Sequence, residues 1–257
     1  LEDEGEFLTA VRSCWCALWS TRALRYMATH DADPADTAMA LIIQPLVHAY
    51  ASGGGLSHTA EGEMLLSATL GLGSAIAQGE VVPDRYVLGR DGEIREIAGG
   101  RKTHSVGCTH GTQTIERAVA EEPCLTPARV KELGGYLLRA EEVVGGPAEI
   151  EWSLDDTGFK LLQVRPLHIE EETIDLDEVW AQKPRLRGHP AGVGWGTGRA
   201  CVVNCEREVS RIGPGDVLVT KVAGPALSQM LPQVSAVVAE LGGSTSHLAS
   251  LARERGI

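Results

Sequence analysis

The chain has 257 residues, of which 43% are hydrophobic, and a formal net charge of −12. This length and apolar content suffice for one large or two modest domains with buried cores. The acidic charge and the lack of a basic run argue against a nucleic-acid partner, because a strand is bound by lysine and arginine side chains that neutralise its phosphates. No apolar stretch approaches the roughly 20 residues that span a bilayer, and no signal-peptide pattern is visible. We therefore expect a cytoplasmic protein without a membrane partner, and the first residue, Leu1, leads us to expect an internal piece of a longer chain.

Six cysteines are scattered through apolar or strand-like sequence, without the paired spacing of a metal site. We expect reduced thiols in the core, with a zinc site or a disulfide framework as the alternatives. The six are Cys14, Cys16, Cys108, Cys124, Cys201 and Cys205.

The N-terminal part of the chain predicts a helix followed by a strand. Apolar residues recur at helical spacing through residues 6–27, which predicts one amphipathic helix. The continuous apolar run 38–44 predicts a buried strand. The glycine-rich residues 51–56 predict a hairpin turn.

The next stretch predicts strands around a glycine turn. An apolar strand leads into Gly71 and Gly73 and then into a short helix around residues 75–78. A Gly-x-Gly at such a turn is a weak signal for phosphate binding. Residues 87–104 alternate around an Arg-Asp-Gly turn, which predicts a hairpin whose second strand ends near Lys102.

A second predicted hairpin occupies residues 149–166, where two alternating strands are joined by an Asp-Asp-Thr-Gly turn. Glu149 and Glu151 share one face of the first strand, and Gln163 and Arg165 share one face of the second. Antiparallel pairing would bring these four side chains together. Oxygen ligands suit Mg²⁺ and arginine suits phosphate, so this face predicts a floor for Mg-ATP. A solvated face with cross-strand ion pairs is the alternative.

The end of the chain combines an apolar strand, a glycine pair and a helix start. The run 234–241 leads into Gly242 and Gly243, and the Ser/Thr residues that follow predict a helix whose first turn contains His247. Free backbone N–H groups and the positive end of the helix dipole would stabilise a phosphate on the imidazole. The Thr245 hydroxyl adds a further donor. A solvated cap histidine is the alternative.

This last stretch resembles the phosphohistidine signature of the phosphoenolpyruvate-utilising enzymes, the family of phosphoenolpyruvate synthase and pyruvate phosphate dikinase. The signature Gly-Gly-x-Thr-x-His, followed by Ala and then by Ala-Arg-Glu-x-Gly-Ile, is present from Gly242 to Ile257. The likeness extends over residues 6–257 and includes the hairpin at 149–166, which resembles the closing hairpin of the family's nucleotide-binding domain.

The resemblance implies an α/β (α+β) fold class, with the C-terminal lobe of an ATP-grasp domain followed by a β/β/α phosphohistidine swivelling domain. We expect the ATP-grasp lobe to span residues 1–169 and the swivelling domain residues 187–257. The acidic, proline-containing residues 170–186 would form the linker.

The resemblance also assigns roles to single residues. His247 would carry the phosphoryl group with Thr245 beside it, and Glu151 and Gln163 would hold Mg²⁺. The residues expected to contact the nucleotide are Arg22, Gln44 on the adenine hinge, Gly71, Gly73, Lys102, Glu149 and Arg165. For Arg22 and Lys102 a solvated surface charge is the alternative. Ser74 departs from the family, which has an acidic residue at this position.

The implied activity is that of a dikinase-type phosphotransferase that depends on ATP and Mg²⁺. His247 would attack a nucleotide phosphate, and the linker would let the domain swing to a small-molecule acceptor, pyruvate before others. Pyruvate would become phosphoenolpyruvate, with release of AMP and phosphate. A homodimer is one possible assembly. Two alternatives stay open: a phosphotransferase or ATP-dependent condensing enzyme for another small molecule, similar to rifampin phosphotransferase, and a nucleotide-binding module without turnover, which Ser74 supports.

Overall fold

The computed structural model describes residues 3–29, 31–107, 111–114, 121–168, 186, 188–192 and 194–257. It divides into two compact units, residues 1–46 and 47–257. The predicted linker at 170–186 lies almost wholly outside the described residues, so the predicted domain boundaries stay predictions. Among the helices in the described ranges, none has the length and apolar character needed to cross a bilayer.

The first unit contains α1 (Glu4–Ala17), α2 (Thr21–Thr29) and the short 3-10 helix η1 (Pro34–Asp36). The prediction of one continuous helix over 6–27 is wrong. The Ser20 hydroxyl accepts a hydrogen bond from the Ala23 N–H at 3.2 Å, which caps a new helix and ends the first one.

The predicted buried strand at 38–44 is also wrong. This segment forms no strand among the described residues, and Ile42 and Ile43 are 89% and 68% exposed. An apolar run is buried only where a second surface covers it, and the described part of the first unit provides none over these two side chains.

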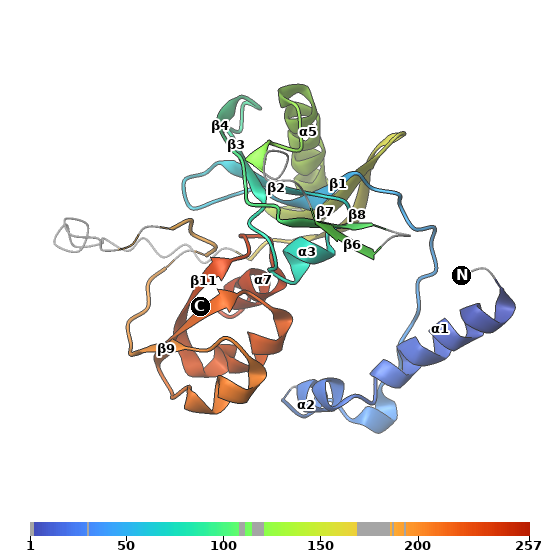
Figure 1. Ribbon diagram of the computed structural model, residues 1–257, viewed down its shortest axis with the longest axis vertical. Helices are drawn as coiled ribbons and strands as arrows, with labels where there is room; N and C mark the ends of the chain where they lie inside the picture. The colour runs from blue at the N-terminus through green and yellow to red at the C-terminus, as the bar shows by residue number, and fades with distance from the viewer. Residues whose placement is uncertain are drawn as a thin grey trace. The chain divides into compact units, whose positions relative to one another are not determined.

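A six-stranded antiparallel sheet, in the order β4-β3-β2-β1-β7-β8, is the largest sheet of the second unit (Figure 1). Its strands are β1 (Ala51–Leu56), β2 (Met64–Leu70), β3 (Asp84–Leu88), β4 (Ile94–Ala98), β7 (Ala148–Asp155) and β8 (Gly158–Pro166). A two-stranded hairpin, β5 (His104–Gly107) with β6 (Gly111–Thr114), touches it through a bridge between Gly71 and Val106. Both predicted hairpins are confirmed, as β3–β4 and β7–β8, although β4 ends before Lys102.

β1 corrects the turn predicted for the glycine-rich residues 51–56, because this segment is a central strand paired with β2 and β7. A Cβ at Gly53 would lie 1.8 Å from the Ser67 carbonyl oxygen. The glycine is therefore required by the close approach of the neighbouring strand and not by a turn.

The two faces of this sheet differ in polarity, because successive side chains of a strand alternate between them. The apolar face packs against α5 (Pro127–Val144), which Figure 1 shows lying along the sheet. α5 begins with Thr126 as N-cap and Pro127 in the first turn, both residues that favour a helix start. The main core lies between them and includes Met64, Leu66, Tyr86, Leu133, Leu137 and Trp152. By register, the opposite face carries Ser52, Ser67, Thr69, Glu149, Glu151, Ser153, Gln163 and Arg165.

A smaller parallel sheet, in the order β11-β10-β9, follows in the chain. Its elements are β9 (Ala200–Val202), η2 (Glu206–Arg211), β10 (Asp216–Val222), η3 (Pro225–Gln233), β11 (Val234–Leu241) and α7 (His247–Arg253). Leu218, Leu231 and Leu248 form the centre of a second core. An antiparallel sheet followed by a smaller parallel one confirms the mixed α/β fold class.

The cysteines do not follow the prediction of buried core thiols. Cys14, Cys16 and Cys205 are exposed free thiols, whereas Cys201 is buried and Cys124 is partly buried. Helix α1, which carries the first two, has no buried residue. Cys108 lies outside the described residues.

Candidate active site

A cavity of about 270 Å³ opens on the polar face of the six-stranded sheet. Strands β1 and β7 form its floor, the short helix α3 (Ser74–Ala77) forms one wall, and the loop before α7 reaches into it. The polar and glycine residues that shape it include Gly54, Gly73, Ser74, Glu149, Glu151 and Thr245.

The β7–β8 hairpin brings the four predicted side chains together, as expected. Glu149 stands opposite Arg165, and Glu151 stands opposite Gln163. An ion pair joins Glu149 Oε1 to Arg165 Nη2 at 3.3 Å. The geometric prediction is therefore confirmed, while the roles of these residues toward metal and nucleotide stay predictions.

The two carboxylates differ in their electrostatic surroundings. Glu149 is 5% exposed and is paired with arginine. Glu151 is half-buried, lines the cavity, and has no hydrogen-bond or ion-pair partner among the residues the structure describes. An uncompensated, partly buried carboxylate favours a cation beside it. Glu151 therefore fits a magnesium ligand better than Glu149 does.

The donor set at the cavity suits Mg²⁺ rather than a metal held entirely by protein. Within the described ranges no cluster of three or more His, Cys, Asp or Glu residues could hold a metal ion. Mg²⁺ is usually bound through one or two carboxylates, retained waters and substrate phosphates. Glu151, which lines the cavity, would supply one carboxylate oxygen to such a set. Gln163 stands opposite it on β8 and could add its amide oxygen, although it is not among the residues that line the cavity.

The glycine turn predicted at Gly71 and Gly73 forms the wall beside α3. Gly71 has a φ of +74°, and its carbonyl accepts a hydrogen bond from Ser52 Oγ at 2.7 Å. Gly73 is the N-cap of α3 and lines the cavity. Ser74 Oγ is buried without a hydrogen-bond partner among the described residues. This hydroxyl is thus a polar group of the cavity wall that a ligand could satisfy.

The loop between β11 of the smaller sheet and α7 lines the cavity through Thr245. α7 begins at His247 with Ser246 as its N-cap, which confirms the predicted helix start. The Thr245 hydroxyl donates to Ser67 Oγ at 3.1 Å and lines the cavity. His247 is exposed, and its Cα can lie no more than about 7.6 Å from that of Thr245, because two peptide units separate them. The imidazole is therefore accessible beside the cavity.

Two predicted nucleotide contacts belong to the first unit. Arg22 lies in α2, with its side chain outside the described part of the chain, and Gln44 is exposed in an extended segment. The cavity described above is built from the second unit alone, so the roles of both residues stay predictions.

Lys102 does not line the cavity. Its ammonium forms an ion pair with Asp84, and both side chains are 0% exposed. Lys102 Nζ also donates to the Glu122 carbonyl at 2.9 Å. The alternative of a solvated strand-end charge is therefore wrong, and a nucleotide contact would require this buried ion pair to open.

Replacing Lys102 with methionine is expected to destabilise the protein by about 3–5 kcal/mol, because Asp84 would be left as an uncompensated buried charge. The matched control is Lys131→Met, which removes an ion pair with Glu93 whose side chains are 48% and 63% exposed and which should cost less than about 1 kcal/mol. Urea unfolding of both variants measures the two losses. Equal losses would contradict a structural role for the Lys102 ion pair.

Sequence reasoning did not identify the residues of α7 that contact the hairpin. Arg253 Nη2 donates to Glu149 Oε2 at 3.3 Å, and Ser250 Oγ donates to the same oxygen at 3.2 Å. Arg165 Nη2 donates to Ser250 Oγ at 2.7 Å, and Arg165 Nη1 lies 3.6 Å from Glu254 Oε1. Burial lowers the pKa of the Arg253 guanidinium, and the Glu149 carboxylate opposes this shift. The Ala-Arg-Glu segment of the family signature marked these positions but not their contacts.

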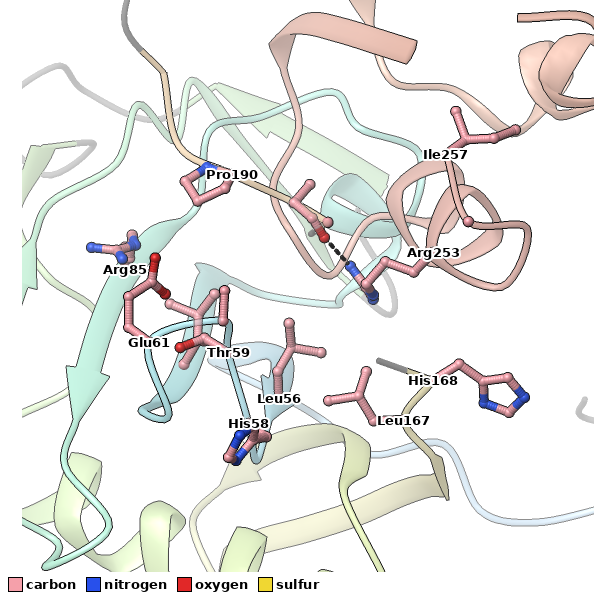
Figure 2. Close-up of a pocket in the computed structure, with 15 residues that line it drawn as sticks. Leu56, His58, Thr59, Glu61, Arg85, Leu167, His168, Pro190, Arg253 and Ile257 are labelled. Carbon is pink, nitrogen blue, oxygen red and sulfur yellow. Dashed lines mark hydrogen bonds between the residues drawn. The ribbon is translucent and has the colours of Figure 1, made fainter. Parts of the chain in front are cut away.

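A second, smaller cavity of about 70 Å³ lies next to Arg253 (Figure 2). In Figure 2 the Arg253 side chain reaches a backbone carbonyl, that of Ala191, at 2.8 Å. The labelled His168 side chain points away from the other lining residues. The larger cavity, which holds the uncompensated carboxylate, is therefore the candidate site.

A polar cavity with an uncompensated carboxylate, a glycine turn and an accessible imidazole on a second sheet domain has the parts of a phosphotransferase. Comparison with known proteins agrees. Residues 1–184 match the family model of the pyruvate phosphate dikinase AMP/ATP-binding domain, and residues 212–257 match that of the PEP-utilising enzyme mobile domain. The chain belongs to the pyruvate phosphate dikinase family of PEP-utilising enzymes, and its fold is an ATP-grasp-type domain followed by a swivelling domain.

Individual relatives agree with this family. The probable phosphoenolpyruvate synthase of Pyrococcus horikoshii is 31% identical over 98% of this chain and 33% of its own length. The phosphoenolpyruvate synthase of Escherichia coli is 29% identical over 97% of this chain and 35% of its own length. An uncharacterized phosphotransferase of Bacillus subtilis is 30% identical over 72% of this chain and 23% of its own length. The chain thus spans about a third of the length of the synthases that it matches.

Proposed function

We propose that this chain is the nucleotide-binding and phosphohistidine part of an enzyme similar to phosphoenolpyruvate synthase, with pyruvate as the acceptor. The observation that carries the proposal is that Thr245, two residues before His247, lines the same cavity as Glu151. The synthases among the relatives support the reaction. The acceptor site would lie in the part of the enzyme that this chain does not span.

The proposed reaction has two transfers. A nitrogen of His247 forms a bond to the β-phosphorus of ATP while the P–O bond to AMP breaks. Water then hydrolyses the P–O–P bond of the pyrophosphoryl group and releases phosphate, and the phosphoryl group that stays on His247 later passes to the enolate oxygen of pyruvate. Overall, ATP, pyruvate and water would give phosphoenolpyruvate, AMP and phosphate. His247 must be neutral to attack, since a protonated imidazole has no lone pair to offer.

Residues that line the cavity or stand beside it on β8 would orient the nucleotide. Arg165 can contact phosphate oxygens through its forked guanidinium, and the Thr245 hydroxyl can donate to the phosphoryl group on its way to His247. Mg²⁺ held at Glu151 and Gln163 would offset the negative charge of the phosphates. The Ser74 hydroxyl is a further donor, in place of the family's carboxylate.

The products of ATP turnover test this reaction. The full-length protein, incubated with Mg-ATP, should form AMP, phosphate and phosphoenolpyruvate over many turnovers only when pyruvate is added, whereas without pyruvate it should release one AMP and one phosphate per phosphorylated His247. Phosphorus NMR can follow these products. The matched control omits pyruvate. ADP as the main product, formed with or without pyruvate, would contradict the synthase reaction.

Two alternatives each have a specific observation in their favour. The Bacillus subtilis relative, a phosphotransferase without a named substrate, supports a related enzyme with another small-molecule acceptor. The replacement of the family's acid by Ser74, whose hydroxyl has no hydrogen-bond partner in the described part of the chain, supports a nucleotide-binding module without turnover. Phosphorylation of His247 without transfer to pyruvate would favour the first alternative, and ATP binding without phosphorylation the second.

A further inference from the structure

Thr245 fits against a position of the sheet that has no side chain. A Cβ built at Gly54 would lie 2.8 Å from both Cβ and Cγ2 of Thr245, and the three atoms nearest to it all belong to that threonine. Ser67, which stands opposite Gly54 in the register of β1 and β2, accepts the Thr245 hydroxyl hydrogen bond at 3.1 Å. The loop before His247 therefore rests in a slot that only a glycine at position 54 leaves open.

Arg253, at the other end of α7, links three separate parts of the structure. Its Nη1 donates to the Ser244 carbonyl, in the loop before His247, and to the Ala191 carbonyl at 2.8 Å. Its Nη2 donates to Glu149 Oε2 on β7 at 3.3 Å. The side chain is 9% exposed, so these contacts are largely shielded from water. A planar guanidinium can make all three contacts at once, whereas an ammonium presents a single point charge.

We propose that Arg253 and Gly54 are positioning residues that seat the histidine-bearing domain on the nucleotide sheet in the geometry for phosphoryl transfer. Arg253 fixes the His247 loop through Ser244 and anchors it to Glu149. Gly54 lets Thr245 approach the sheet. The inference rests on the proposed function, because it concerns the transfer from ATP to His247.

This assignment changes the role expected of Glu149. Both of its oxygens are engaged, Oε1 by Arg165 and Oε2 by Arg253 and Ser250. The carboxylate thus serves as the anchor of the seated domain, and Glu151 is left as the carboxylate available to a cation.

The first test compares Arg253→Met with Arg255→Met in the full-length protein. Arg255 lies just beyond α7, is exposed, and has no hydrogen-bond or ion-pair partner through its side chain among the described residues. Arg253→Met should slow phosphorylation of His247 by on the order of 10²-fold, because a shift of about 1 Å can cost that much. Its affinity for Mg-ATP should equal that of Arg255→Met, and Arg253→Lys should recover part of the rate. Equal phosphorylation rates in the two methionine variants, or a parallel loss of Mg-ATP affinity in Arg253→Met, would overturn the proposal.

Gly54→Ala provides a second variant that acts on the slot. Carbon atoms pack at about 3.5–4.0 Å, so the new methyl group would displace Thr245 by roughly 1 Å. Phosphorylation of His247 should fall by a factor similar to that for Arg253→Met, on the order of 10²-fold. A wild-type rate of His247 phosphorylation in Gly54→Ala would contradict the role proposed for Gly54.

A disulfide trap separates this inference from the proposed function, since it needs no catalytic activity. The hydroxyl oxygens of Ser67 and Thr245 are 3.1 Å apart, so the double variant Ser67→Cys/Thr245→Cys should form a disulfide under mild oxidation, with Ser67→Cys alone as the control for native thiols. Adding Arg253→Met should slow this cross-link, and adding Arg255→Met should not. If the wild type takes up no phosphoryl group, the proposed function fails. The rate of cross-linking then still tests whether Arg253 holds Thr245 against Ser67. Failure of the double variant to cross-link, or an equal rate of cross-linking in both triple variants, would overturn the inference that Arg253 positions this domain.

Discussion

Replacing His247 with alanine is expected to abolish the uptake of a phosphoryl group from Mg-ATP. The imidazole is exposed at the start of α7, two residues after a threonine that lines the candidate nucleotide cavity. An alanine has no lone pair with which to attack phosphorus, so no covalent intermediate can form. Intact-protein mass spectrometry of the full-length protein at neutral pH, which preserves acid-labile phosphohistidine, would show a gain of one phosphoryl group in the wild type and none in the variant.

The control for this prediction is another exposed histidine. His48→Ala removes an imidazole that lines neither cavity, and it should be phosphorylated like the wild type. A phosphoryl gain that persists in His247→Ala would place the modification elsewhere and contradict the relay. A wild type that binds ATP without any gain in mass would instead support the nucleotide-binding module.

The parts of the fold that were predicted correctly depend on local patterns. The β7–β8 hairpin could be predicted because the alternation of its strands and the turn between them lie within a single stretch, which fixes the register. The start of α7 could be predicted from its own Ser/Thr cap. Both signals are complete within a few residues and need no knowledge of the rest of the chain.

The wrong predictions concern residues whose structure depends on their surroundings in the fold and not on the local sequence. The glycines of β1 have the composition of a turn, yet they serve to admit Ser67 and Thr245 from other segments. The apolar residues 38–44 have the composition of a buried strand, yet the described residues of the first unit do not cover them. Lys102 could be a solvated surface charge by its place in the sequence, yet it forms an ion pair with Asp84 in the core. In the first and third cases the deciding contact comes from another segment of the chain, and in the second the covering contact is missing among the described residues of the first unit.

The candidate site shows the same division. The pairing of Glu149 with Arg165 followed from strand register, whereas its pairing with Arg253 joins residues 104 positions apart. That second contact arises from the docking of one sheet domain on another, which no local pattern encodes. Consequently the sequence could nominate both carboxylates of β7 but could not tell which of them is left without a counter-charge.

The difference between these carboxylates leads to the prediction for Glu151→Gln. The substitution preserves the shape of the side chain and removes its charge, so the metal would lose a direct ligand. Loss of even an outer-shell partner costs about 10–100-fold in metal affinity, and the Mg²⁺-dependent part of ATP affinity should fall at least as much. Isothermal titration calorimetry of ATP binding with and without Mg²⁺ measures this part of the affinity. The matched control is Glu142→Gln, at an exposed position of α5.

Thermal unfolding provides a second readout that does not depend on activity. Without metal and nucleotide, Glu151→Gln should unfold at the temperature of the wild type or above it, because the lost carboxylate had no partner among the described residues. Mg-ATP should raise the unfolding temperature of the wild type and of Glu142→Gln by more than that of Glu151→Gln, since stabilisation by a ligand falls as its affinity falls. An undiminished shift in Glu151→Gln would mean that the cation is held elsewhere. In that event Glu151 would be a cavity carboxylate without a metal, and the floor predicted from the hairpin would have to be assigned to the nucleotide alone.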